Sequence, residues 1–264
     1  MHTSRDAPLR AWEKAEIGRS HAEADRISDQ KFRSPDKLVA RYRNPPADTP
    51  YPLEYAFHLV GEIDGKRVID FGCGTGSNSL VLASRGANVC GIDISHDLLS
   101  IARRRLQQFA SSGRARFLTA SAHDLPLQDE SFDLVFGIAI LHHLELPLVA
   151  REVHRVLKRG GRAVFLEPVR DSRLLKLGRR LFPVKGDDVS PFERPLTTAE
   201  IAEFGAGFSR IAIKGFSLPH VRAAARFGVF KKRIDPLYRL DRALLKRYPS
   251  LEFFSAMRVI ELTK

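Results

Sequence analysis

The sequence predicts an α/β fold with a mostly parallel sheet flanked by helices. Between residues 67 and 169, apolar runs of strand length alternate with helical segments, as in parallel strands joined by right-handed helical crossovers. The first run breaks into a glycine-rich turn and the second ends in an acid, which is typical of a ligand-binding sheet edge. A chain of 264 residues accommodates one such domain with extra helices, but two full domains are not expected.

Residues 1–64 are predicted to be helical. One polar helix opens at residues 12–17 and continues towards residue 33, and a second starts at residues 34–39 with a cap residue, a first-turn proline and an early acid. Consecutive prolines in residues 44–50 interrupt the pattern because proline donates no backbone hydrogen bond. A helix resumes at residues 51–60. Three aromatic side chains in this region line a lid or belong to the core: Trp12, Tyr42 and Tyr51.

The first strand, residues 67–69, ends in Asp70 and turns through Gly72, Gly74 and Gly76. Glycines at alternate positions let the backbone bend, approach a ligand closely and direct amide groups towards it. An acid before these glycines suits a cation or an amine and repels a pyrophosphate, which favours a zwitterionic ligand. The dinucleotide fingerprint has a third glycine three residues after the second. This chain has a serine there, so a nicotinamide dehydrogenase is disfavoured.

The second strand, residues 87–95, carries Asp93 about 20 residues after the glycines, where an acid suits bidentate hydrogen bonding to two ribose hydroxyls. Ser95 is expected to cap a helix over residues 96–110. The remaining pattern gives a third strand closed by residues 121–127, a fourth strand with its exit loop at residues 131–144, and a helix end, double-glycine turn and fifth strand at residues 155–168.

The C-terminal third is expected to complete the sheet. The pattern predicts a basic helix at residues 174–182, a loop at 183–195, a capped helix from 197–200, and strands at 210–216 and 257–262. Roughly forty residues separate these strands, and their periodic leucines predict helices. The predicted organisation is an N-terminal helical lid (1–64), a core (65–216), a helical insertion acting as a second lid (217–252) and the last strand (253–264).

Taken in order, these motifs resemble the class I S-adenosylmethionine-dependent methyltransferases, in the branch that includes ubiquinone, menaquinone and many natural-product methyltransferases. The resemblance covers residues 66–169. It implies a Rossmann-like seven-stranded sheet whose last two strands form an antiparallel pair. It also implies S-adenosylmethionine as the cofactor and methyl transfer by in-line displacement, in which the protein mainly aligns the nucleophile and excludes water.

The resemblance implies a role for each motif. Asp70 and the glycine-loop backbone would hold the methionine part of the cofactor, Asp93 the ribose hydroxyls and Asp124 the adenine amino group. The alternative for each acid is a strand-end cap or a closed turn. The full set of predicted cofactor-binding residues is Asp70, Gly72, Cys73, Gly74, Gly76, Asp93, Ile94, Ser121, Ala122, Asp124, Leu125 and Ile138.

His142 and His143 follow the fourth strand, where this family brings cofactor and acceptor together. A histidine there could deprotonate a hydroxyl or thiol near neutral pH. Adjacent residues leaving a strand point in different directions, so one of them, His143 in preference, is expected to face the pocket. The alternative is a helix-start cap or a packed ring. Four charged residues near the fifth strand are expected either to bind a polar acceptor or, in the interpretation we prefer, to form ion pairs that hold the following loop in place: Glu167, Arg170, Glu193 and Arg194.

The chain carries a formal net charge of +12, and residues 222–247 hold nine basic residues against two acids. Such a segment suits an anionic membrane surface, nucleic acid or an acidic substrate. A solvated helix face is favoured over any single partner. The start lacks an apolar core, the longest apolar run (135–141) is too short to span a bilayer, and two cysteines form neither a disulfide framework nor a metal site. These features predict a cytoplasmic protein.

The sequence therefore predicts a methyltransferase acting on a small, mostly apolar acceptor, aromatic or isoprenoid. One rival is an RNA methyltransferase, suggested by a pI near 10. It is disfavoured because the chain has no separate RNA-binding module, no Asn-Pro-Pro-Tyr-type motif after the fourth strand and no aromatic-rich basic stripe. A second rival is a protein that binds the cofactor without turnover. The acceptor, the methylated atom and the oligomeric state stay open.

Overall fold

The computed structural model describes residues 6–28, 36–109, 114–170, 194–221, 224 and 234–264. The strands are β1 (Arg67–Phe71), β2 (Asn88–Asp93), β3 (Ala115–Thr119), β4 (Phe132–Ile138), β5 (Leu157–Pro168), β6 (Arg210–Phe216) and β7 (Met257–Thr263). The helices described are α1 (Asp6–Ser28), α2 (Asp36–Arg43), α3 (Pro52–Val60), α4 (Ser77–Ser84), α5 (His96–Gln108), α6 (Leu146–Val156), α8 (Thr198–Gly205) and α10 (Asp235–Arg247), with short 3-10 helices η2 (Leu141–His143) and η3 (Pro249–Phe254).

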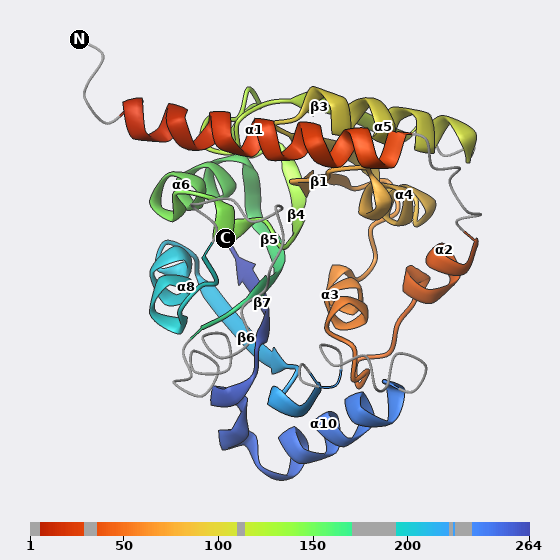
Figure 1. The fold of residues 1–264 in the computed structure, drawn as a ribbon, viewed down its shortest axis with the longest axis vertical. Helices are drawn as coiled ribbons and strands as arrows, with labels where there is room; N and C mark the ends of the chain where they lie inside the picture. Colours follow the sequence, from red (N-terminus) through yellow and green to blue (C-terminus); the bar gives the residue numbers. More distant parts are fainter. Residues whose placement is uncertain (1–5, 29–35, 110–113, 171–193, 222–223, 225–233) are drawn as a thin grey trace.

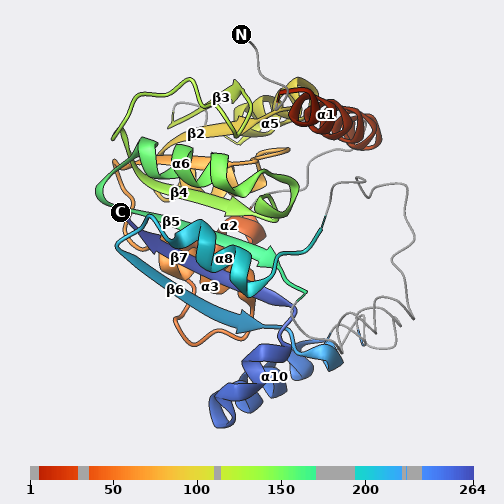
Figure 2. The same ribbon diagram turned by 90° about the vertical axis from the view of Figure 1, so that its left-hand side faces the viewer.

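The seven strands form one sheet in the order β3-β2-β1-β4-β5-β7-β6. The first five strands of this order pair in parallel, and β7 runs antiparallel to both β5 and β6. Helices cover both faces of the sheet (Figures 1 and 2). This arrangement confirms the predicted α/β fold with an antiparallel final pair.

Residues 121–127 close the third strand as predicted, because β3 ends at Thr119 and a turn follows. One local prediction differs from the structure. The double glycine at residues 160–161 does not form a separate turn before the fifth strand but lies within β5. The pairing of β4 with β5 shifts register there, and Gly160 has φ +72°. A glycine in this conformation lets an irregular strand bend without losing its place in the sheet.

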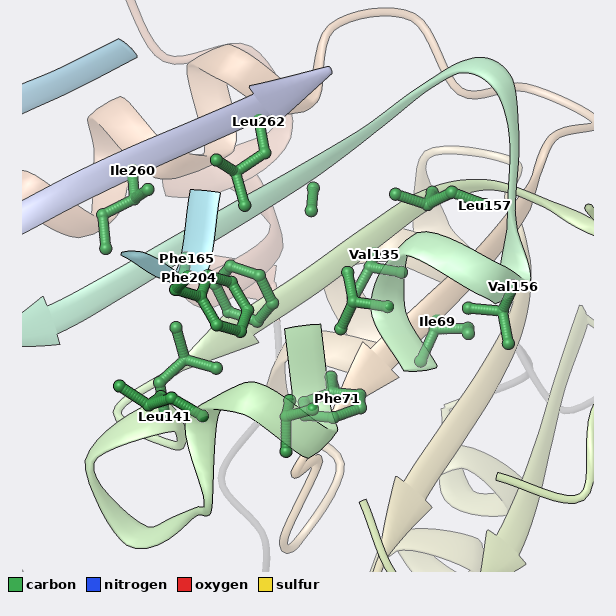
Figure 3. Close-up of a cluster of buried hydrophobic side chains, with 14 of the residues drawn as sticks. Ile69, Phe71, Val135, Leu141, Val156, Leu157, Phe165, Phe204, Ile260 and Leu262 are labelled. Carbon is green, nitrogen blue, oxygen red and sulfur yellow. The ribbon is translucent and has the colours of Figure 1, made fainter. Parts of the chain in front are cut away.

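The core lies on both faces of the sheet because side chains alternate along each strand. On one face, Phe165 of β5 packs edge-on against Phe204 of α8, with ring centroids 5.7 Å apart, among side chains from α6 and β7 (Figure 3). On the other face, Phe57 of α3 packs against Phe136 of β4 at 4.8 Å. The two apolar layers fix the strands whose carboxyl ends carry the site.

The described N-terminal helices differ in their positions. Helix α3 packs against β5 and β7 of the sheet, and α2 packs on α3 and α4, with the rings of Tyr42 and Phe57 tilted to each other at 4.9 Å in the core. Helix α1 lies instead alongside α5, near the ends of β2 and β3 (Figures 1 and 2), and His21 lies 2.7 Å from Asp97 of α5. Of the helices within residues 1–64, α1 is therefore the one placed over the sheet edge.

Helix α10 follows β6 at the far corner of the sheet from α1 (Figures 1 and 2). Asp241 is 1% exposed and accepts hydrogen bonds from the backbone amides of Ser217 and Leu218 at 3.0 and 2.8 Å. Tyr238 packs against Tyr51, with ring centroids 5.0 Å apart. The insertion between the last strands is thus anchored through its own buried carboxylate, at a distance from helix α1.

Several predictions fall on residues outside the described ranges. These are the helix at residues 174–182, most of the loop at 183–195 and the first half of the basic segment 222–247. The described half of that segment belongs to α10, where Arg239, Lys246 and Arg247 are exposed. Contact of this segment with an anionic surface stays a prediction. In the described part of the chain, every helix is too short or too polar to cross a membrane.

Candidate functional site

A cavity of about 250 Å³ lies where the carboxyl ends of β1, β2 and β4 meet helix α1. Open α/β sheets bind ligands at this edge. Where the strand order reverses, the loops after two neighbouring strands run to opposite faces of the sheet and leave a crevice between them. Its wall comes from the glycine loop after β1, the end of β2, the loop after β3, the exit of β4 and one side of α1. Predicted site residues that border it are Gly72, Gly74, Asp93, Ile94, Ser121, Ala122 and His143.

Gly72 is required by both conformation and space. Its φ is +69°, and a Cβ atom at this position would lie 2.6 Å from the side chain of Ile140. The loop therefore presses directly against the exit of β4, and a larger residue would separate them. Gly76 has a different role, because its Cβ would meet Ala102 of α5 at 2.8 Å and it does not border the cavity. It is a packing glycine at the start of α4.

Asp93 joins the end of β2 to the glycine loop. Its Oδ2 accepts a hydrogen bond from the Gly74 amide at 2.9 Å, and its Oδ1 accepts one from the Ser95 amide at 2.9 Å. Burial raises the pKa of Asp93, and these two amide donors oppose the rise. A carboxylate oxygen accepts more than one hydrogen bond. The side chain therefore keeps acceptor capacity towards the cavity that it lines.

Asp70 lies beneath the glycine loop rather than in the cavity wall. Its side chain is 1% exposed, and Oδ2 accepts a hydrogen bond from the Ser79 hydroxyl at 2.5 Å. Among the described residues no donor reaches Oδ1. Burial raises the pKa of Asp70 to about 7. A buried carboxylate oxygen without a donor indicates a missing partner, for which an amine or an ordered water is chemically suited.

The exit of β4 is held by Glu167 of β5. This fully buried carboxylate accepts hydrogen bonds from the amides of Ile140 and Leu141, each at 2.8 Å, and Oε2 lies 2.7 Å from His142 Nδ1. The preceding residue, Ala139, has φ +54°, a conformation that costs energy for a residue with a Cβ. Glu167 thus holds a strained turn in place at the cavity wall.

The two histidines of this exit occupy different surroundings. Their rings lie 4.1 Å apart, but His142 points back to Glu167 whereas His143 borders the cavity. Nδ1 of His143 lies 3.5 Å from Glu16 Oε2 of helix α1, without the alignment of a hydrogen bond. His143 is therefore the histidine positioned to meet a ligand.

The other predicted contacts do not border the cavity. Leu125 is in the core, because its amide donates to Glu152 Oε2 at 2.7 Å and this bond holds the turn with the side chain inward. Asp124 is exposed, Cys73 is buried within the loop, and Ile138 packs on the opposite face of the sheet. Their roles towards a cofactor stay predictions that this geometry does not favour.

Helix α1, in the segment predicted as an N-terminal lid, supplies one wall of the cavity, and apart from Trp12 the motifs did not indicate its lining residues. Its cavity-lining side chains are Trp12, Glu13, Glu16, Arg19, Ser20 and Glu23. The hydroxyl of Ser121 donates to Glu13 Oε1 at 2.5 Å, and Arg19 Nε donates to Glu16 Oε2 at 3.1 Å. Spacings of three and four residues place this stripe on one side of a helix. That polar stripe was the available signal, although nothing local says what it faces.

The family of this chain follows from comparison with known proteins. A family model described as a methyltransferase domain matches residues 69–165. The chain is 34% identical over 161 residues to a 2-phytyl-1,4-naphtoquinone methyltransferase from Synechococcus elongatus, covering 56% of this chain and 69% of that protein. The chain belongs to the class I S-adenosylmethionine-dependent methyltransferases. It is also 40% identical over 109 residues to a demethylmenaquinone methyltransferase from Clavibacter sepedonicus, covering 41% of this chain and 43% of that protein. The chain thus spans less than half the length of that relative.

Solved structures of the methyltransferase fold resemble this chain. Geranyl diphosphate C-methyltransferase from Streptomyces coelicolor has a TM-score of 0.56 at 17% identity, covering 80% of this chain and 77% of that one. The [4+2]-cyclase SpnF has a TM-score of 0.55 at 23% identity, covering 87% and 80%. At these identities the likeness shows the fold alone. A cyclase shares it, so fold by itself does not establish methyl transfer.

S-adenosylmethionine is the cofactor of this methyltransferase family, and the residues present fit it. The buried Asp70 oxygen without a donor suits an ammonium group near the glycine loop. The close approach of Gly72 to Ile140 leaves loop backbone, rather than side chain, at the cavity wall. Asp93 offers acceptor oxygens at the end of β2, the position from which acids bind ribose hydroxyls.

Proposed function

We propose that this protein transfers a methyl group from S-adenosylmethionine (SAM) to a small, largely apolar acceptor. The observation that carries the proposal is a single cavity bordered by the glycine loop, by Asp93 and by His143. When bound, SAM supplies a methyl group that is already activated on a positively charged sulfur. The protein then has to align the acceptor, exclude water and remove a proton where the acceptor carries one.

Each bordering residue, and Asp70 beneath the glycine loop, receives a role in this proposal. Asp93 binds the ribose hydroxyls, and the backbone of Gly72 and Gly74 binds the methionine part. Asp70 supports that loop from below and accepts a hydrogen bond from the amine. His143 is the general base, because it faces the cavity while His142 is held by Glu167. A positioned histidine of this kind contributes about 10²–10⁴-fold to a rate.

Support for an apolar acceptor comes from the cavity and the relatives. The wall near His143 includes Ile140, Leu144 and Phe71, and α1 encloses it. Two relatives are named as methyltransferases of a menaquinone precursor and of a phytyl naphthoquinone. An aromatic or isoprenoid acceptor is therefore the class to test first. A protein that binds SAM without turnover is the second candidate, because the fold also serves a cyclase.

The test is product formation with defined acceptors. The purified protein is incubated with SAM and a short-chain naphthoquinol, a catechol or bulk transfer RNA, and S-adenosylhomocysteine (SAH) and the methylated product are measured by mass spectrometry. We expect turnover with an aromatic hydroxyl or carbon acceptor and none with RNA. His143→Gln should lower the turnover by about a hundredfold or more.

Two results would contradict the proposal. Turnover of RNA alone would reassign the acceptor. Binding of SAM with no turnover of any of the apolar acceptors would favour the second candidate.

A further inference from the structure

The cavity is acidic although the protein is basic. Among the described residues, its wall has four carboxylates, from Glu13, Glu16, Glu23 and Asp93, and one guanidinium, from Arg19. With histidines neutral, these described lining residues carry a formal charge of −3, in a chain with a net charge of +12. Three of the four acids come from α1. The field inside the cavity therefore favours a cationic ligand, and most of it comes from this helix.

The three acids of α1 face different parts of the wall. Glu13 is bound by the Ser121 hydroxyl and lies 3.4 Å from Nδ1 of His123, in the loop after β3. Glu23 lies near the end of β2, where its charge acts on Asp93 and Arg19 Nη1 lies 3.5 Å from it. Glu16 lies between them, against the exit of β4.

Glu16 is the most enclosed of the three. It is 8% exposed, and its Oε2 lies 3.1 Å from Arg19 Nε and 3.5 Å from His143 Nδ1. His143 follows Ile140, whose side chain touches the Gly72 position of the loop. The Glu16 carboxylate thus stands over the corner of the cavity where the glycine loop meets the candidate base. A methyl donor and an acceptor have to meet at this corner.

We propose that Glu16 distinguishes the positively charged methyl donor from its uncharged-sulfur product. This inference rests on the proposed function. SAM and SAH differ by one methyl group and one positive charge, so a fixed carboxylate in a mostly enclosed cavity binds the former more strongly. One such charge pair at a partly buried site corresponds to about tenfold in affinity. Helix α1 then favours the binding of SAM, and it binds the product SAH less strongly because SAH lacks the positive charge.

A purely structural role for Glu16 makes a different prediction. If this carboxylate only orients His143 or fastens α1, its removal changes the binding of SAM and SAH by the same factor, because both present the same nucleoside and amino acid. Charge discrimination changes the ratio of the two affinities. The ratio is measured without turnover, so it does not depend on finding the acceptor.

The chain provides its own reporter for this measurement. Trp12 is the only tryptophan in the sequence and lines the cavity from α1. Its fluorescence is titrated with SAM, with SAH and with sinefungin, which carries a protonated amine in place of the methylated sulfur. The variants are Glu16→Gln and, as the matched control, Glu23→Gln, which removes one charge from the same helix at a more exposed position. Glu16→Asp keeps the charge on a shorter side chain.

We expect Glu16→Gln to weaken the binding of SAM and sinefungin by about tenfold and that of SAH by less than about twofold. Glu23→Gln should leave the ratio of SAM to SAH affinity within about threefold of the unaltered protein, and Glu16→Asp should lie nearer to it than Glu16→Gln does. Equal losses for all three ligands, or no change, would overturn the inference while the proposed function stands. Failure of the unaltered protein to bind either SAM or SAH would overturn the proposed function itself.

Discussion

Replacing Asp70 with asparagine is expected to stabilise the ligand-free protein increasingly as the pH rises. The Asp70 side chain is 1% exposed, one oxygen has the Ser79 hydroxyl as its donor, and no described residue donates to the other. Burial raises its pKa from 3.8 to about 7. Asparagine has the same shape and keeps an acceptor for Ser79, but it carries no charge to bury.

The direction and the size of this stabilisation follow from the raised pKa of Asp70. Below pH 3.8 the carboxyl is protonated in the folded and unfolded chain, and its contribution to stability is fully present. Between pH 3.8 and about 7 the unfolded chain ionises while the folded chain keeps its proton, so stability falls as the pH rises. Complete loss corresponds to about 4 kcal/mol at 1.36 kcal/mol per pKa unit. From pH 5 to pH 8 the advantage of the asparagine variant should grow by about 2.5 kcal/mol.

The assay is urea unfolding of both proteins at pH 5, 6, 7 and 8, followed by circular dichroism. Comparing the two proteins at each pH cancels the groups that they share. A difference in unfolding free energy that stays constant with pH would refute the reasoning, because it would mean that Asp70 titrates alike in the folded and unfolded chain. Serine-to-alanine replacement at Ser79 is the companion control. It removes the hydroxyl donor and should raise the pKa of Asp70 further, so that in this variant the loss of stability extends to higher pH.

Two further variants test the loop and the insertion. Gly72→Ala places a Cβ 2.6 Å from Ile140 at φ +69°, so we expect a loss of about 1–3 kcal/mol in stability and at least tenfold weaker SAH binding. Gly207→Ala, with open space around it, is the control and should change neither quantity. Equal effects at both sites would contradict this role of Gly72. Asp241→Asn turns an NH₂ group towards one of two buried amides, so urea unfolding should show a loss of about 1–3 kcal/mol, whereas calorimetry should show unchanged SAH affinity because α10 does not border the cavity. A fall in affinity without a fall in stability would link α10 to the site.

The predicted and observed site agree where the relevant contacts are local or follow from the sheet. Asp93 ends the strand beside the one that carries the glycine loop, so parallel pairing alone brings its side chain to Gly74. The alternation of strands and helices predicted a parallel sheet, and β1 to β5 do pair in parallel. The capping box of Thr197 and Glu200 was readable because its hydrogen bonds span three residues.

Other contacts had no local signal. Glu13 meets Ser121 across 108 positions in sequence, and Glu16 meets His143 from the opposite side of the cavity. Such pairs depend on where α1 packs, which its weak apolar pattern does not specify. Ile138, a predicted site residue, does not border the cavity for a different reason. It shares strand parity with Leu134 and Phe136, and that face turns away from the cavity, so period-two alternation applied strictly would have removed it from the predicted site.

The proposed methyl transfer depends above all on a cavity that binds S-adenosyl ligands through Asp93. The direct measurement is calorimetric titration of the protein and its Asp93→Ala variant with SAH, with NADH as counter-ligand. We predict that SAH binds the unaltered protein, that the variant loses this binding, and that NADH does not bind. Binding of NADH in place of SAH, or SAH binding that survives in Asp93→Ala, would contradict the assignment of this cavity.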